Sequence, residues 1–223
     1  MQTKNKPLER VLSKERLGAY QAKWVQGMPS SPIALYRWNT LLSESFYPIL
    51  QTIEVILRNA MHLAISEHFQ DSTWLLNPAI LEHKDYIEVQ KQEGRLTQHR
   101  QPTVTRGNII AELSFGFWTG LLDAHYEMKF WRSKIIKKTF PHMLPRDRMR
   151  HKLFKHFNKI RKLRNRIFHY EPIWYWQDLK KQHEDIRLAI GWIEPAALKL
   201  CTPDRFDTVY EQGPTSMLLD SLF

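Results

Sequence analysis

The stretch "LRNRIFHYEP", residues 163–172, places two arginines, an asparagine and a histidine at the end of a predicted helix. The proline predicts where this helix ends, because the residue before a proline is disfavoured in the α region. Such residues are typical either of a polar helix terminus or of a functional site. The positions of the side chains around the helix help to decide between the two.

The basic helix predicted over about residues 146–168 has one apolar side, which is expected to face a core. At about 100° per residue, this side holds Leu153, Phe157, Ile160, Ile167 and Phe168. Arg164 falls in the middle of the apolar side, and Arg166 falls opposite it. Asn165 and His169 are four residues apart and therefore share a flank of the helix. The two arginines are thus predicted to have different roles.

Arg164 has two interpretations, because a bare charge against a core is costly without a partner. In the structural one it pairs with a buried carboxylate, for which Glu54 is the candidate. In the functional one it lines a polar crevice and presents its guanidinium to a phosphate. Spacing favours neither. Arg166 is expected to be an ordinary surface cation, and a histidine at a helix end, taken alone, is more typical of a cap or a satisfied core group.

Positive charge is concentrated on this helix. The chain has a formal net charge of +10, and residues 146–166 contain ten lysines and arginines against one acid, Asp147. The segment 128–138 adds five cations around an aromatic pair. Basic residues interleaved with aromatic ones suit phosphate contact and base stacking, and we favour this over a solvated cationic surface. The candidate RNA-binding residues are Lys155, Lys159, Arg161, Lys162 and Arg166.

The remaining periodicity is helical almost throughout, and strand signals are weak. Ser31 and Pro32 are typical of an N-cap and first helical residue. A second helix is expected after Pro48, with one apolar face formed by Ile49, Ile53, Ile56, Ala60, Leu63 and Ala64. Further helices are predicted over 81–96 and 177–192, an apolar segment over 109–126, and a polar connector over 101–108.

These patterns predict an all-α fold, a bundle of four or five core helices with extra flanking helices. Residues 1–203 are expected to form a single domain and residues 204–223 a loosely packed C-terminal tail. The single cysteine, Cys201, indicates a reducing compartment. Neither an apolar signal segment nor a run of about 18 apolar residues is found, so a soluble cytoplasmic protein is expected. His151 and His156 are five apart, a poor spacing for metal ligands on a helix.

The extended stretch "LRNRIFHYEPIW" (163–174) resembles the signature of the Abi-like, abortive-infection proteins of the HEPN superfamily. Four further blocks resemble that family in the same order, so the likeness covers about residues 10–200. They are "YRWNTLLSESFYPILQTIEVILRNAMH" (36–62), "AELSFGFWTGLL" (111–122), "KFW" (129–131) and "AIGWIEP" (189–195). The resemblance implies a HEPN-like helical bundle.

The resemblance also implies an endoribonuclease that acts in phage defence or as a toxin and needs no metal or other cofactor. Arg164, Asn165 and His169 match its motif of an arginine, a four-residue gap and a histidine. HEPN proteins commonly dimerise with their motifs facing each other, so a homodimer with a composite site is expected. An antitoxin or small RNA is a further expected partner, and no membrane is. The alternative is an RNA-binding protein without catalysis, part of a ribonucleoprotein.

Two features depart from this simple correspondence. Many HEPN toxins have a tyrosine two residues after the histidine, whereas here Tyr170 follows His169 directly and Glu171 takes the second place. The triplet "LRN" also recurs at 57–59, with His62 four residues beyond Arg58. We favour a Glu54–Arg58 ion pair over a second motif there. Residues expected to support the site without performing the chemistry are Glu54, Arg58, Asn59 and Tyr170.

Overall fold

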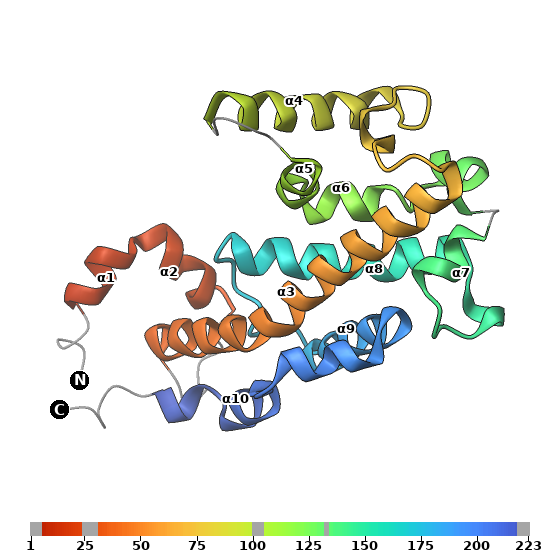
Figure 1. The fold of residues 1–223 in the computed structure, drawn as a ribbon. Coiled ribbons are helices and arrows are strands. Elements are labelled where there is room, and N and C mark those ends of the chain that lie inside the picture. Colours follow the sequence, from red (N-terminus) through yellow and green to blue (C-terminus); the bar gives the residue numbers. More distant parts are fainter. Residues whose placement is uncertain (1–5, 24–30, 100–104, 132–133, 218–223) are drawn as a thin grey trace. The chain divides into compact units, whose positions relative to one another are not determined.

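The computed structural model describes residues 6–23, 31–99, 105–131 and 134–217, and within these ranges every regular element is a helix (Figure 1). The predicted all-α class is therefore confirmed. The α-helices are α1 (Lys6–Leu12), α2 (Lys14–Gln21), α3 (Pro32–Phe69), α4 (His83–His99), α5 (Arg106–Glu112), α6 (Phe115–Gly120), α7 (Ile135–Thr139), α8 (Arg150–Phe168), α9 (Leu179–Ile193) and α10 (Phe206–Gln212). Short helical turns are η1 (Trp74–Leu76), η2 (Ala124–Tyr126), the π-turn η3 (Glu127–Trp131), η4 (Pro145–Asp147), η5 (Pro195–Cys201) and η6 (Pro214–Met217).

The chain divides into two compact units. Unit 1 comprises residues 1–48, 163–184 and 201–223, and unit 2 comprises residues 49–162 and 185–200. Three of the boundaries fall inside α-helices, after Pro48 in α3, after Lys162 in α8 and after Glu184 in α9. The predicted domain boundary at residue 203 does not coincide with these divisions, because residues 201–223 belong to unit 1. No helix among the described residues is both long and apolar enough to cross a membrane.

Helix α3 is one continuous helix of 38 residues rather than the two helices expected around Pro48. It begins as predicted, with the Ser31 hydroxyl accepting a hydrogen bond of 3.2 Å from the Ala34 amide. Pro48 has no amide hydrogen, so the Glu44 carbonyl loses its usual helical donor. Apolar residues on either side of the proline, Phe46 and Ile49 among them, are buried. We infer that their burial outweighs the lost hydrogen bond.

The apolar face predicted for residues 49–64 is only partly correct. Ile49, Ile53 and Ala64 are buried as expected, but Leu63 is 60% exposed. Leu57 and Met61 are fully buried in its place. The sequence Ile53, Leu57, Met61, Ala64 keeps the three- and four-residue spacing of one helical stripe, and Leu63 falls outside that stripe.

Unit 1 contains an aromatic cluster that includes residues from the C-terminal part of the chain. The rings of His183 and Phe206 stack with centroids 4.4 Å apart, and Phe46 packs edge-on against Phe206 at 4.9 Å. Trp38 Nε1 donates to the Val209 carbonyl at 2.9 Å. Residues 206–212 therefore form a packed helix, which corrects the prediction of a loosely packed tail for that segment. Residues 218–223 of the predicted tail lie outside the described residues.

Unit 2 is also centred on aromatic side chains. Trp74 and Trp118 meet edge-to-face at 6.3 Å, and the rings of Tyr126 and Phe130 stack at 4.9 Å. Helix α4 packs against α5 and η1 and presents Val89 and Leu96 to the interior, in agreement with the predicted charged helix over 81–96 (Figure 1). The predicted apolar segment 109–126 is divided among α5, α6 and η2. Residues 101–104 of the predicted connector lie outside the described residues.

The substitution Pro48→Ala is expected to raise the free energy of unfolding by up to about 3 kcal/mol, because alanine restores the missing helical hydrogen bond and removes the ring clash. Pro32→Ala is the matched control, since a proline in the first turn of a helix replaces an amide that has no partner there. Urea denaturation of the two variants measures both effects. A Pro48→Ala variant less stable than the parent would show that packing around the ring outweighs the backbone cost.

Candidate functional site

Helix α8 ends in a hydrogen-bonded turn that carries His169 and Tyr170. The Tyr170 amide donates to the Ile167 carbonyl at 3.0 Å, and the Glu171 amide donates to the Arg166 carbonyl at 2.9 Å. This pair of bonds is a Schellman motif, which terminates a helix with one residue in the left-handed region. Here that residue is Tyr170, with φ 57°. The predicted end of the helix before Pro172 is confirmed. The two hydrogen bonds of the Schellman motif define how the helix ends.

Two long-range contacts within unit 1 hold this turn. Asn39 of α3 accepts hydrogen bonds at its Oδ1 from the amides of Ile173 (2.7 Å) and Trp174 (3.2 Å). Arg16 of α2 donates from Nη1 to the Tyr170 carbonyl at 2.7 Å. Asn39 is only 4% exposed, so its two bonds are shielded from water. The backbone after α8 is therefore fixed from α2 and from α3.

Arg166 is not the ordinary surface cation that was predicted. Its Nε donates to the Pro172 carbonyl at 2.8 Å, and its Nη2 donates to the Tyr175 hydroxyl at 2.8 Å. Its Nη1 lies 3.2 Å from the Glu171 carboxylate. The side chain is 28% exposed and its guanidinium fork is largely committed to the chain that follows the turn. Its proposed contact with RNA stays a prediction, with less of the side chain available for it.

Arg164 lies half-buried in the last turns of α8, against an aromatic ring. Its guanidinium carbon is 4.2 Å from the centroid of the Phe168 ring, a geometry typical of a cation–π contact. Phe168 was predicted to be buried and is instead 44% exposed, whereas Leu163 is fully buried. The Phe168 ring also contacts Tyr47, with centroids 5.4 Å apart. The pairing of Arg164 with Glu54 stays a prediction.

The two other predicted catalytic residues, Asn165 and His169, follow this arginine at the same helix end. His169 is exposed, and Asn165, one helical turn earlier, is half-buried. The His169 amide donates to the Asn165 carbonyl at 2.9 Å, so the helical hydrogen-bond pattern extends to His169. An exposed imidazole can meet a substrate, and histidine is a common general acid or base in catalysis. Arg164, Asn165 and His169 thus occupy one short segment of unit 1.

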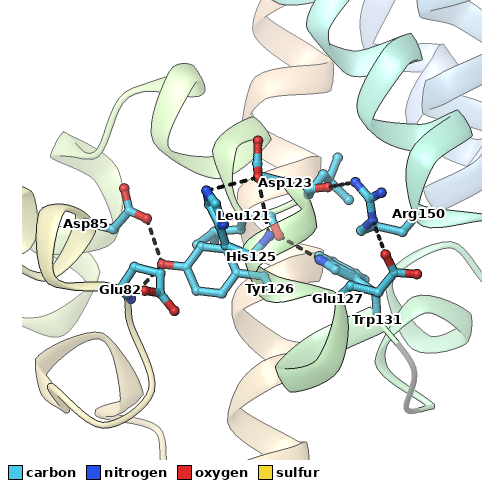
Figure 2. Close-up of polar contacts among 10 residues, drawn as sticks. Glu82, Asp85, Leu121, Asp123, His125, Tyr126, Glu127, Trp131 and Arg150 are labelled. Atoms are coloured by element: carbon cyan, nitrogen blue, oxygen red, sulfur yellow. Dashed lines mark hydrogen bonds and ion pairs between the residues drawn. The ribbon is translucent and has the colours of Figure 1, made fainter.

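The first cations of the basic segment are engaged within unit 2. Arg150 donates from Nε to Glu127 at 3.0 Å and from Nη1 to the Leu122 carbonyl at 3.0 Å (Figure 2). Its side chain is only 13% exposed. Arg148 donates to the Pro141 carbonyl, and Lys152 donates to Asp147. These three cations tie α8 and its preceding turn to neighbouring loops, which leaves them poorly placed for phosphate.

Figure 2 also shows how the segment that pairs with Arg150 is held. The Tyr126 hydroxyl donates to Asp85 at 2.7 Å and accepts from the Glu82 amide at 2.9 Å. Burial raises the pKa of Tyr126, so the hydroxyl keeps its proton for this bond. Trp131 Nε1 donates to the Leu121 carbonyl at 2.6 Å. We infer a structural role for this polar cluster, since its bonds fix the start of α4 and the turn around η3.

Three lysines farther along α8 are exposed and lie on one stripe. Lys155, Lys159 and Lys162 have the spacing i, i+4, i+7, which places them on the same face of the helix. We call them the lysine stripe. Arg161, the other predicted RNA contact here, is half-buried and donates twice to Asn158 Oδ1, at 3.2 and 2.7 Å. The lysine stripe is therefore the part of the basic helix best placed to meet an anionic partner.

The residues of the "LRN" echo lie in unit 2. Arg58 donates from Nη1 to the Ala111 carbonyl of α5 at 3.3 Å, Glu54 is half-buried, and Asn59 is exposed. His62 Nδ1 accepts a hydrogen bond of 3.0 Å from Trp74 Nε1, and burial lowers the pKa of His62. His62 is thus a packed acceptor, which favours a structural interpretation of the echo. The Glu54–Arg58 ion pair stays a prediction.

Sequence reasoning missed Asn39 and Arg16, which position the turn. Their partners are 134 to 154 residues away in the chain, so no local pattern indicates the contacts. The one available signal was an asparagine within the apolar spacing of α3, where a buried amide needs partners.

Among the described residues, no group of three or more histidine, cysteine, aspartate or glutamate side chains could hold a metal ion. His156 Nε2 lies 2.8 Å from the Asp185 carbonyl.

The comparisons with known proteins give no relative from which a function could be transferred. No family model, no curated protein and no solved structure matches the chain.

The substitution Tyr170→Gly is expected to raise the free energy of unfolding by about 1 kcal/mol, because glycine adopts a positive φ without the steric cost of a Cβ. The side chain is 69% exposed, so little packing is lost. Tyr170→Ala is the matched control: it removes the ring, keeps the Cβ, and should bring no gain. Thermal and urea denaturation measure both. Equal stabilisation by glycine and alanine would show that the tyrosine ring, and not the positive φ of the backbone, destabilises the fold at this position.

Proposed function

We propose that this protein is a metal-independent endoribonuclease of the HEPN type that acts in phage defence or as a toxin. The proposal includes a HEPN-like bundle as the finer description of the all-α fold. The observation that carries it is the end of α8, where exposed His169 and half-buried Arg164 lie on a segment braced by Asn39 and Arg16. A rigid support of this kind is what a site for a charged transition state needs.

The chemistry uses the nucleophile that RNA itself supplies. The 2′-hydroxyl loses its proton to a base and attacks the adjacent phosphorus, and the bond to the 5′-oxygen breaks. That oxygen takes a proton from an acid, so the products are a 2′,3′-cyclic phosphate and a 5′-hydroxyl. His169 serves in proton transfer, and Arg164 donates its planar fork to the charged phosphate oxygens. Asn165 orients His169 or binds a phosphate oxygen.

One histidine cannot easily be base and acid in the same turnover. The proposal therefore includes a symmetric homodimer in which each protomer supplies one Arg164 and one His169 to a composite site. An antitoxin or small RNA partner belongs to the same proposal as the means of control. Lys155, Lys159 and Lys162 would hold the RNA backbone, because exposed lysines on one stripe match a row of phosphates.

The decisive experiment compares the parent protein with His169→Ala on total RNA in the presence of a chelator, with analysis of the product ends. The parent is expected to give cyclic phosphate ends and His169→Ala to give none, because the proton-transfer group is gone. His125→Ala is the matched control, since the His125 side chain is 66% exposed and lies outside the signature. Cleavage by His169→Ala at the parent's rate would refute the proposal. RNA binding without cleavage by the parent would support the non-catalytic alternative.

Replacement of the three lysines Lys155, Lys159 and Lys162 by glutamine is expected to weaken RNA binding and to flatten its salt dependence. For single-stranded RNA the slope of log affinity against log salt should fall in magnitude by about 2, because each phosphate contact contributes about 0.7. The control replaces three exposed cations of α4, Lys84, Lys91 and Arg95, and changes the net charge equally. Fluorescence anisotropy at several salt concentrations measures both. Equal slopes for the two variants would indicate a non-specific charge effect.

A further inference from the structure

A pocket of about 280 Å³ adjoins the turn at the end of α8, entirely within unit 1. We call it the tyrosine pocket, because four of its lining residues are Tyr20, Tyr36, Tyr47 and Tyr170. The polar residues Asn39 and Glu44 also line it. Its volume is slightly below the range typical of sites for drug-sized ligands, which suits a small planar group.

Three of the four tyrosines of the pocket, Tyr36, Tyr47 and Tyr170, are partly or largely exposed to water, whereas Tyr20 is fully buried. Tyr20 and Tyr36 meet edge-to-face with centroids 5.4 Å apart. Tyr47 and Tyr170 are 40% and 69% exposed. Aromatic side chains of this kind stack on nucleobases, and each stack contributes appreciably to the binding of single-stranded nucleic acid.

The pocket also has polar groups whose hydrogen-bonding capacity is not used up. The Tyr20 hydroxyl is fully buried and has no hydrogen-bond partner among the described residues. Burial, with a smaller contribution from Tyr36, raises the pKa of Tyr20 to about 12, so the hydroxyl remains a donor. Asn39 uses its Oδ1 for the amides of Ile173 and Trp174, which leaves the Nδ2 group to donate. The Glu44 carboxylate is a further acceptor among the lining residues, exposed and 3.9 Å from Arg205 Nη1.

These groups match the edge of an unpaired base. A Watson–Crick edge carries donors and acceptors side by side, and it is free only when the base is not paired. A ligand that accepts from the Tyr20 hydroxyl would satisfy a buried group that is costly to leave without a partner. Because that hydroxyl is covered, a small movement of the Tyr20 ring accompanies such a contact.

A continuous series of contacts joins the tyrosine pocket to the predicted catalytic residues. The Arg164 guanidinium lies 4.2 Å from the Phe168 ring, and that ring lies 5.4 Å from Tyr47 of the pocket wall. Tyr170, on the pocket side, directly follows His169 in the chain. A nucleotide with its phosphate at Arg164 and His169 therefore has the tyrosine pocket within reach of its base.

The backbone of Tyr170 gives independent support. This residue has a φ of 57° at a helix end where glycine is the usual choice. Its ring is largely exposed, so packing does not explain why a tyrosine stands there. Strained positions of this kind cluster at ligand-binding sites.

We propose that the tyrosine pocket binds one unpaired nucleobase of an RNA strand, next to the phosphate that Arg164 and His169 would act on. The link to cleavage rests on the function proposed above, whereas base binding itself does not. The consequence is a preference for single-stranded RNA, because a base in a duplex is stacked and paired and cannot enter.

The test measures the binding of a short, fluorescein-labelled single-stranded RNA to proteins that carry His169→Ala, so that the probe stays intact. Tyr170→Gly and Tyr47→Ala are each expected to weaken binding about tenfold, through the loss of one aromatic face. Tyr86→Ala on α4 is the control and should leave binding unchanged. An abasic oligoribonucleotide of the same length should bind all these proteins equally, because it offers phosphates without bases.

Parent-like affinity of both Tyr170→Gly and Tyr47→Ala for the normal strand would overturn the proposal. A duplex bound as tightly as the single strand would overturn it too. Tyr170→Gly guards against misfolding as an explanation, since that variant is expected to be more stable than its parent. If the parent cleaves RNA but the pocket variants bind normally, base binding fails and the proposed nuclease stands. If the pocket variants lose binding but the parent never cleaves RNA, base binding stands and the proposed nuclease fails.

Discussion

The paired hydrogen bonds to Asn39 Oδ1 are the constraint on which the candidate site depends. One oxygen on α3 accepts both the Ile173 and the Trp174 amide, so the chain that leaves α8 cannot move away from α3 without exposing two buried donors. Each such loss costs about 1 to 3 kcal/mol. Arg16 bonds the Tyr170 carbonyl on the α2 side, and Arg166 bonds the Pro172 carbonyl from within. The position of His169 follows from these contacts.

The helix wheel gave a correct account of the middle of α8 and a poorer one of its end. Leu153, Ile160 and Ile167 are buried as predicted, because a regular helix repeats its faces. At the end of α8 the following chain folds back against the helix. A helical wheel represents only the residues of the helix, so it cannot show contacts with that chain. Arg166 accordingly finds acceptors six and nine residues ahead, while Phe168 stays exposed and lies against Arg164. The Asn39 contacts span more than 130 residues, so periodicity could not have indicated them.

The charge of the basic segment has more than one use. A count of charges treats these cations as equivalent, but their hydrogen-bond partners show that they have different roles. Arg150 and Arg148 donate to backbone carbonyls near the start of α8, Arg166 fastens the turn at its end, and the lysine stripe is exposed between them. Arg148, Arg150 and Arg166, whose planar forks can make several hydrogen bonds, take structural positions, while Lys155, Lys159 and Lys162, which act as point charges, remain at the surface. A count of charges therefore overstates the surface available to an anion.

Tyr170 shows how local strain and long-range contacts are related in this structure. A left-handed residue other than glycine is unfavourable by itself, so a free helix end would avoid it or choose another turn. Here the carbonyl of Tyr170 is bound by Arg16, and the two residues after Pro172 are bound by Asn39. The surrounding structure thus leaves the backbone few alternatives, and the strain persists. The turn carries exposed His169 and exposed Tyr170 as consecutive residues, and Tyr170 lines a pocket together with three other tyrosines. A glycine would end the helix equally well and present no ring, and for this reason we assign the ring, rather than the turn, to function.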